Sequence, residues 1–221
     1  MSTTIFLTDS HALSDLQVFL ARAARVEEGS VRLTAANSVL LVYSAVLSRR
    51  GLLDSGPTVL GLRTFALTEP IVLDTVVSVR SVLERIAHLP DSDRVTDAPV
   101  SVPVPHETTS VSWAGISPPR GGWEPRGQAQ AADLEAAARA GIDEIAAAIP
   151  VGTGEQIVQR VRSGVWGRPM DGLGDLPGVP AGAAFAAFSL GFLTADEPVR
   201  LFQTGSWLRL STARGHVLVK N

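Results

Sequence analysis

Residues 112–125 read SWAGISPPRGGWEP, and this stretch divides the chain into two parts of different character. Pro118 and Pro119 remove backbone donors and the glycines weaken backbone order, so no helix or central strand can run through it. Disordered linkers are poor in aromatic residues, yet Trp113 and Trp123 supply large apolar anchors near its two ends. We therefore predict an ordered, irregular connector at 112–127, pinned at both ends, through which the second half packs on the first.

The part before the connector, residues 1–111, has the pattern of a β-rich domain with two helices. A short strand at 4–7 precedes a helical stripe at 10–28, which Asp9 or Ser10 can cap. Alternating and β-branched residues then predict a hairpin at 30–47 and a strand at 58–67. Apolar residues at helical spacing predict the second helix between Asp74 and Pro90.

The part after the connector, residues 128–221, predicts three helices followed by a three-stranded meander. The first helix is expected at 128–149. The second should follow a capping box formed by Thr153 and Gln156. The third is expected at 181–193, where the chain is apolar enough for a buried helix. Turns at 204–205 and 213–215 divide the meander. Three helices followed by a β-hairpin is the order of a winged-helix module. The fold class we expect is α+β, with a winged-helix-like C-terminal domain.

Composition removes several classes of protein. The chain has no cysteine, which excludes disulfides, thiol nucleophiles and cysteine metal sites. Neither a signal peptide nor a membrane span is visible, so we expect a cytoplasmic protein without membrane association. The net charge is −3, and neither half is strongly basic. We expect no cofactor, because residues 151–155 and 172–174 lack the remaining residues of a phosphate- or dinucleotide-binding loop.

Candidates for catalysis are weak. His11, His88, His106 and His216 fall at no metal-ligand spacing. Residues 187–191, AFSLG, resemble the nucleophile elbow G-x-S-x-G, but that elbow follows a strand, whereas Ser189 lies inside an expected helix. We do not expect an enzyme, and a small serine hydrolase using Ser189 is retained only as an alternative.

The meander is the basic part of the second half. From Pro198 onward it contains no acidic residue, and its basic and histidine side chains are Arg200, Arg209, Arg214, His216 and Lys220. A nucleic-acid interface is one interpretation, although the expected helix at 181–193 lacks the charges of a recognition helix. The other interpretation is docking of these arginines against the acidic helix at 128–149, which we favour.

The connector contains one arginine, Arg120. It can clamp an anionic group, but stacking on Trp113 or Trp123 is favoured, because these partners lie within a few residues. The candidate interaction surface therefore consists of Arg120, Arg200, Arg209, Arg214 and His216.

Four stretches carry a family resemblance: WAGISPPRGGW at 113–123, VWGRP at 165–169, PAGAAFA at 180–186 and LSTARGHVLV at 210–219. They resemble an uncharacterised family of high-GC bacterial proteins, and this resemblance implies no activity. The order of elements at 10–89 is similar to one subdomain of a DNA sliding clamp, although no repeat of that unit follows and the helix at 10–28 is not basic.

Taken together, these features favour a non-catalytic interaction or regulatory protein that binds another protein. Nucleic-acid binding is the alternative partner class, and a homo-oligomer is left open.

Overall fold

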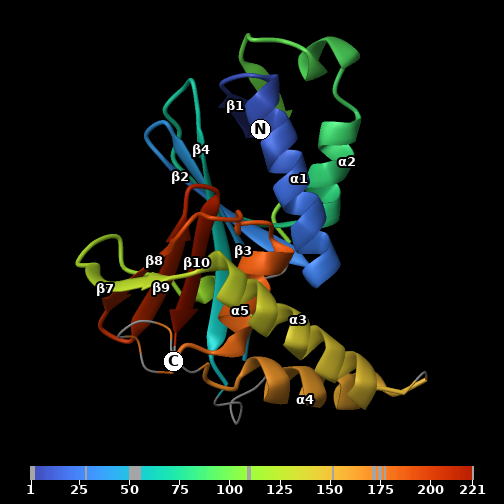
Figure 1. Ribbon diagram of the computed structural model, residues 1–221. Coiled ribbons are helices and arrows are strands. Elements are labelled where there is room, and N and C mark those ends of the chain that lie inside the picture. The colour runs from blue at the N-terminus through green and yellow to red at the C-terminus, as the bar shows by residue number, and fades with distance from the viewer. Residues whose placement is uncertain are drawn as a thin grey trace. The chain divides into compact units, whose positions relative to one another are not determined.

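The computed structural model describes residues 3–27, 29–49, 56–108, 111–150, 152–170, 173, 176 and 178–220 (Figure 1). The chain forms two compact units. Unit 1 comprises Met1–Ala45 and Leu62–Gly115, and unit 2 comprises Val46–Gly61 and Ile116–Asn221. The chain thus passes from unit 1 to unit 2 within the expected connector, while residues 46–61 also belong to unit 2.

Unit 1 is built on antiparallel strands. Strands β2 (Ser30–Ala36), β3 (Val39–Leu47), β4 (Thr58–Ala66) and β5 (Leu73–Ser78) follow the order β5-β2-β3-β4. The β2–β3 hairpin turns at Asn37, whose φ of 58° lies in the left-handed region that asparagine tolerates. A separate antiparallel pair joins β1 (Thr4–Leu7) to β6 (Val100–Pro103). The predicted hairpin and its turn are confirmed.

Two helices complete unit 1. Helix α1 (Ser10–Val26) begins where the Asp9 carboxylate accepts a hydrogen bond of 2.8 Å from the backbone N–H of Ala12. Its buried residues include Leu13, Leu16 and Leu20, and this face packs in part on α2 (Val79–Ala87). Figure 1 shows the two helices side by side.

The helix expected from Asp74 begins later, because residues 73–78 form strand β5. Val76 and Val77 pair with Arg32 and Val31 of β2. Branching at Cβ favours a strand over a helix, so this pairing overrides the helical spacing of the valines. Ser78 then caps α2, since its hydroxyl accepts from the N–H of Ser81.

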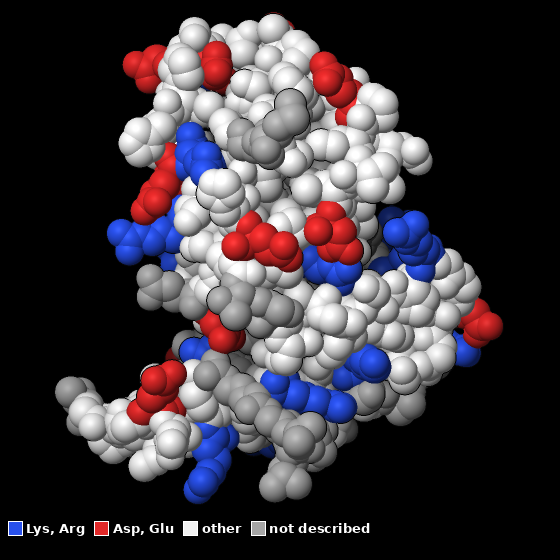
Figure 2. Space-filling view, turned by 180° about the vertical axis from the view of Figure 1, so that it is seen from behind, with Lys and Arg blue, Asp and Glu red and all other residues white. Residues whose placement is uncertain are grey.

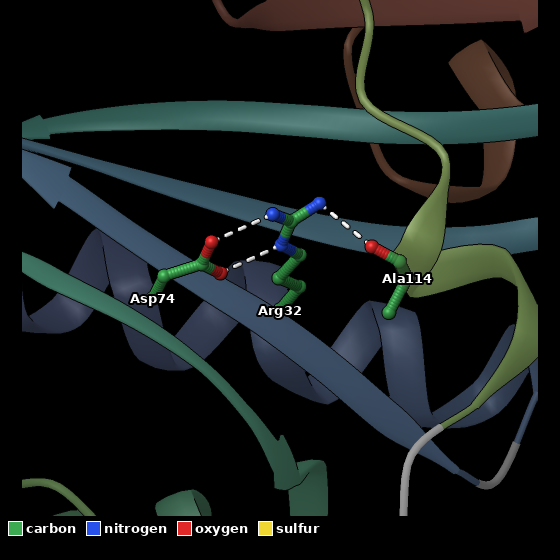
Figure 3. Close-up of polar contacts among 3 residues, drawn as sticks. All are labelled: Arg32, Asp74 and Ala114. Atoms are coloured by element: carbon green, nitrogen blue, oxygen red, sulfur yellow. Dashed lines mark hydrogen bonds and ion pairs between the residues drawn. The ribbon is translucent and has the colours of Figure 1, made fainter.

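Arg32 holds the end of unit 1 in place (Figure 3). Its Nε and one terminal nitrogen donate to both carboxylate oxygens of Asp74, at 2.8 and 2.7 Å. The other terminal nitrogen donates to the carbonyl oxygen of Ala114 at 2.7 Å. Ala114 lies in a 3₁₀ turn at Ser112–Gly115 with Trp113, which is 8% exposed. The first tryptophan of the connector is therefore buried in a turn that Arg32 fixes.

Unit 2 places helices on a second group of antiparallel strands. The order β4-β10-β9-β8-β7 contains β7 (Glu124–Ala129), β8 (Val199–Thr204), β9 (Trp207–Thr212) and β10 (Gly215–Lys220). Helix α5 (Ala181–Ser189) packs on β10, and α3 (Ala131–Ala148) packs on both α5 and α4 (Glu155–Trp166). The predicted meander is confirmed.

Three expectations for unit 2 need correction. The connector does not stay irregular to residue 127, because β7 pairs with β8 through a bulge between Pro125 and Gln128. Helix α4 has no capping box: Gly154 is its N-cap, and the Thr153 hydroxyl donates to the carbonyl of Pro150. Helix α5 ends at Ser189, and Leu190 serves as its C-cap.

Close packing fixes the helices of unit 2. Trp166, the last residue of α4, is 2% exposed and stacks on Phe185 of α5, with ring centroids 4.3 Å apart and planes 15° apart. Its six-membered ring also lies against Gly141 of α3, where a Cβ atom would overlap two ring atoms and crowd a third. On β10, Gly215 lies against the ring of Phe192 in the same way.

The winged-helix expectation for unit 2 is wrong. The strands that follow the helices pair with β7, which precedes them, and with β4. Helix α5 buries five of its nine residues and carries no charge, so it cannot serve as a recognition helix. The order of elements alone did not distinguish a wing from part of a larger antiparallel sheet.

Candidate functional site: an arginine between aromatic rings

The register of the meander brings two rows of side chains to one face of unit 2. Phe202 of β8 lies opposite Arg209 of β9, which in turn lies opposite Leu218 of β10. Two residues further along β9, Ser211 lies opposite Arg200 of β8 and opposite His216 of β10. Residues opposite one another in an antiparallel pair share a face. The leucines at 208 and 210 alternate to the other face and are buried, as the sequence predicts.

Arg209 lies against two aromatic rings. Its guanidinium carbon lies 4.5 Å from the centroid of the Trp123 ring and 4.4 Å from that of Phe202. Such stacking attracts the cation to the negative faces of the rings. Among the described residues, Arg209 has no ion pair, and its Nε is buried without a hydrogen-bond partner.

The end of the connector delivers Trp123 to this position. Trp123 directly precedes β7, whose Glu124 and Pro125 pair with β8, and its indole N–H donates to the carbonyl of Pro119 at 3.1 Å. Arg120, which was expected to stack on a tryptophan, is exposed and makes no such contact in the described part of the chain. The arginine on Trp123 is Arg209, because strand pairing brings together residues that are far apart in sequence.

His216 lies beside the arginines without a positive charge of its own at neutral pH. Its Nδ1 lies 2.9 Å from the hydroxyl oxygen of Ser211. Burial lowers the pKa of His216 below its usual value, and the charges of Arg209 and Arg200 lower it further. The pKa of Arg209 is also lowered, mainly by burial and then by Arg200. We call Trp123, Arg200, Phe202, Arg209 and His216 the arginine patch.

The acids of α3 do not neutralise the arginine patch. Glu135 pairs with Arg139 in the same helix, and Glu144 pairs with Arg168. Within the described ranges, no ion pair links α3 to the meander, so the favoured docking of the two elements is not supported. Arg214 is exposed at the turn between β9 and β10. On the face that Figure 2 shows, acidic and basic side chains are interspersed and form no large field of one sign.

Catalytic candidates gain no support from the geometry. Ser189 is the last residue of α5 and half-buried, so it does not follow a strand as a nucleophile elbow requires. A nucleophilic serine would need a histidine at hydrogen-bond distance, but the serine hydroxyl beside His216 is that of Ser211 and not that of Ser189. In the described part of the chain, no group of three or more histidine and acidic side chains is placed to hold a metal ion. Of residues 172–174, only Leu173 lies within the described residues.

None of the helices in the described ranges combines the length and the apolar character that a membrane crossing needs.

Solved structures with a similar fold are DNA sliding clamps. A sliding clamp (DNA polymerase III subunit beta) from Bartonella birtlesii, bound to griselimycin, has a TM-score of 0.53 at 16% identity, covering 100% of this chain and 65% of that chain. A putative DNA polymerase III beta subunit from Eubacterium rectale has a TM-score of 0.52 at 11% identity, covering 98% and 64%. The clamp from Bacillus subtilis has a TM-score of 0.51 at 10% identity, covering 100% and 64%.

These similarities define a sliding-clamp-like α+β fold and confirm that unit 2 is not a winged helix. The chain spans less than two thirds of the length of these clamps. In sequence, residues 1–108 match a domain of unknown function, DUF8010, and residues 118–221 match another, DUF8185. No curated protein matches the chain in sequence. The two domains of unknown function agree with the expected resemblance to an uncharacterised family.

The candidate interaction surface expected from the sequence did not include the two aromatic residues of the arginine patch, Trp123 and Phe202. Phe202 lies two residues from Arg200 in a strand, so alternation alone places both on one face. Trp123 was expected as an anchor of the connector but not as a neighbour of Arg209, because its place depends on β7, and Pro125 and Gly127 hide that strand in the sequence.

Proposed function

We propose that the chain is a non-catalytic protein-interaction module, and that its binding surface is the arginine patch. The observation that supports this is the contact of Arg209 with both Trp123 and Phe202, with no acidic partner among the described residues. Arginine and tryptophan are enriched among the residues that dominate binding energy at protein interfaces. The clamp-like fold is compatible with such a role but does not by itself identify a partner. A chain without cysteine also fits the cytoplasm, which is where we place it.

Photocrosslinking in the native cell tests this proposal. Benzoylphenylalanine at position 214, beside the arginine patch, should yield a discrete adduct with a protein. The control carries the crosslinker at position 72, where Val72 of unit 1 is 91% exposed. The adduct should weaken when Arg209→Ala is added. If positions 214 and 72 give the same products, the arginine patch is not a protein interface.

Nucleic-acid binding is the second candidate, and the acid-free meander is the observation that favours it. The affinity for duplex DNA would then fall with salt, by about 0.9 log units per log unit of salt for each phosphate neutralised. Filter binding at low salt tests it: retention of DNA or RNA that Arg209→Ala and Arg200→Ala weaken would support this candidate. Retention that both variants leave unchanged would remove the arginine patch from consideration as a nucleic-acid site.

A further inference from the structure

Two aromatic rings restrict the guanidinium group of Arg209. Trp123 and Phe202 both lie against the guanidinium group, and among the described residues its N–H donors make no hydrogen bond. These donors form a planar fork that matches the two oxygens of a carboxylate. The rings also fix the orientation of the guanidinium group, which reduces the entropy that a ligand must remove on binding.

Among the described residues of unit 2, no acidic side chain pairs with Arg209. Within the described ranges its buried Nε has no hydrogen-bond partner, and its diagonal neighbour on β8 is another cation, Arg200. A buried charged donor without a partner costs free energy, and the repulsion between the two arginines adds to that cost. An anion beside the two guanidinium groups would offset the repulsion between them. In the described part of the chain no carboxylate pairs with either arginine.

The spacing of the two arginines suggests the form of the ligand. Arg200 lies opposite Ser211, two residues from Arg209 on the same strand, so the arginines are diagonal neighbours on one face. Diagonal positions in an antiparallel pair are about 7–8 Å apart. In an extended peptide, side chains at positions i and i+2 point to the same side and lie about 7 Å apart. Carboxylates at alternate positions of such a peptide can therefore reach both arginines at once.

We propose that Arg209 and Arg200 bind an extended acidic segment of a partner protein, through carboxylates at alternate positions. This inference rests on the proposed protein-interaction function and specifies the chemistry of the ligand. On the other side of Ser211 from Arg200 lies His216, which is not an acid and so does not compete with a ligand for the arginines. Arg209 supplies the fork, Trp123 and Phe202 hold that fork still, and Arg200 contacts the second carboxylate.

Fluorescence anisotropy with the full chain tests the proposal. The probe is a labelled decapeptide with glutamate at alternate positions, and the matched control is the same peptide with glutamine. We expect the glutamate peptide to bind and the glutamine peptide to bind at least about tenfold more weakly, the loss expected for charge-assisted hydrogen bonds. Equal affinity for the two peptides would overturn the proposal.

Variants connect the binding to the site. Arg209→Lys keeps the charge but loses the planar fork, so it should weaken binding by about tenfold or more. Arg200→Gln changes an exposed side chain and should weaken binding without affecting the fold. Arg160→Gln on α4 removes the same charge from an exposed helical position and should leave affinity unchanged. If Arg160→Gln weakens binding as much as Arg200→Gln does, attraction by total charge replaces the proposed site.

Competitors decide the class of ligand. Inorganic phosphate and a single-stranded oligonucleotide should each displace the glutamate peptide poorly. Tighter binding of the oligonucleotide than of the peptide would overturn the inference in favour of nucleic acid. A protein adduct from position 214 without glutamate-peptide binding would refute this inference alone. Peptide binding without any protein adduct would refute the proposed function instead.

Discussion

Gly141 of α3 offers a test in which two ordinary effects oppose one another. Replacing a glycine inside a helix by alanine normally stabilises the protein by about 1 kcal/mol, because alanine loses less backbone entropy on folding. At position 141, however, the new Cβ would overlap two atoms of the Trp166 ring and crowd a third. That ring is 2% exposed and stacked on Phe185, so it cannot turn aside. Overpacking of this kind typically costs about 1–3 kcal/mol.

We expect Gly141→Ala to lower the free energy of unfolding by about 2 kcal/mol, since the overlap with a rigid ring falls at the upper end of the overpacking cost. For a chain of this length, the melting temperature should fall by about 4–8 °C. The matched control is Gly164→Ala in α4, where a Cβ would meet nothing within 4 Å. That variant should gain about 0.4–1 kcal/mol. Urea denaturation followed by circular dichroism measures both changes.

A double-mutant cycle identifies the cause. Trp166→Leu removes the ring atoms that the new Cβ would meet, so Gly141→Ala should cost nothing further in that background. Two results would refute the reasoning: a Gly141→Ala protein as stable as Gly164→Ala, or an unchanged cost after the tryptophan is removed. Either would mean that α3 and α4 adjust their spacing without strain.

Three further outcomes are expected. Arg32→Ala should lower the free energy of unfolding by about 2 kcal/mol through loss of charged hydrogen bonds to Asp74 and Ala114, and an unchanged urea midpoint would contradict this. His216 should make stability depend on pH: because its folded pKa lies below the unfolded value of about 6.5, stability is full above that pH and falls as pH drops towards the folded pKa. In His216→Gln this loss between pH 7 and 5 should shrink, and an equal loss in both proteins would rule His216 out as its source. Gly215→Ala should cost about 1–3 kcal/mol because its Cβ meets a buried phenylalanine ring, and an unchanged melting temperature would show that the ring moves.

Local signals in the sequence predicted the elements that depend on local chemistry. Asp9 caps α1 and Asn37 turns the β2–β3 hairpin, and both effects act within a few residues. The meander was also predicted from local signals, namely the alternation of apolar residues and the turn residues between its strands. These parts of the fold need no knowledge of distant partners.

The errors share a different physical origin, which is pairing between distant strands. Val76 lies at helical spacing from Val79, yet residues 73–78 pair with β2, more than thirty residues earlier in the chain. The same holds for the candidate site. Its arginines and histidine were identified from charge alone, but the contact of Arg209 with Trp123 depends on β7 joining β8. Arg120 was favoured for that contact only because it is close in sequence.

Strand β7 has a consequence for how copies of this chain meet. It is the last strand of its group, and its single neighbour among the described residues is β8. Pro125 has no N–H to offer, the bulge before Gln128 interrupts the ladder, and Gly127 adopts a φ of 101°. Charged Glu124 and Arg126 pair along the same edge. An edge with these features is a poor template for an additional strand, so it protects the protein against aggregation by open-ended sheet growth.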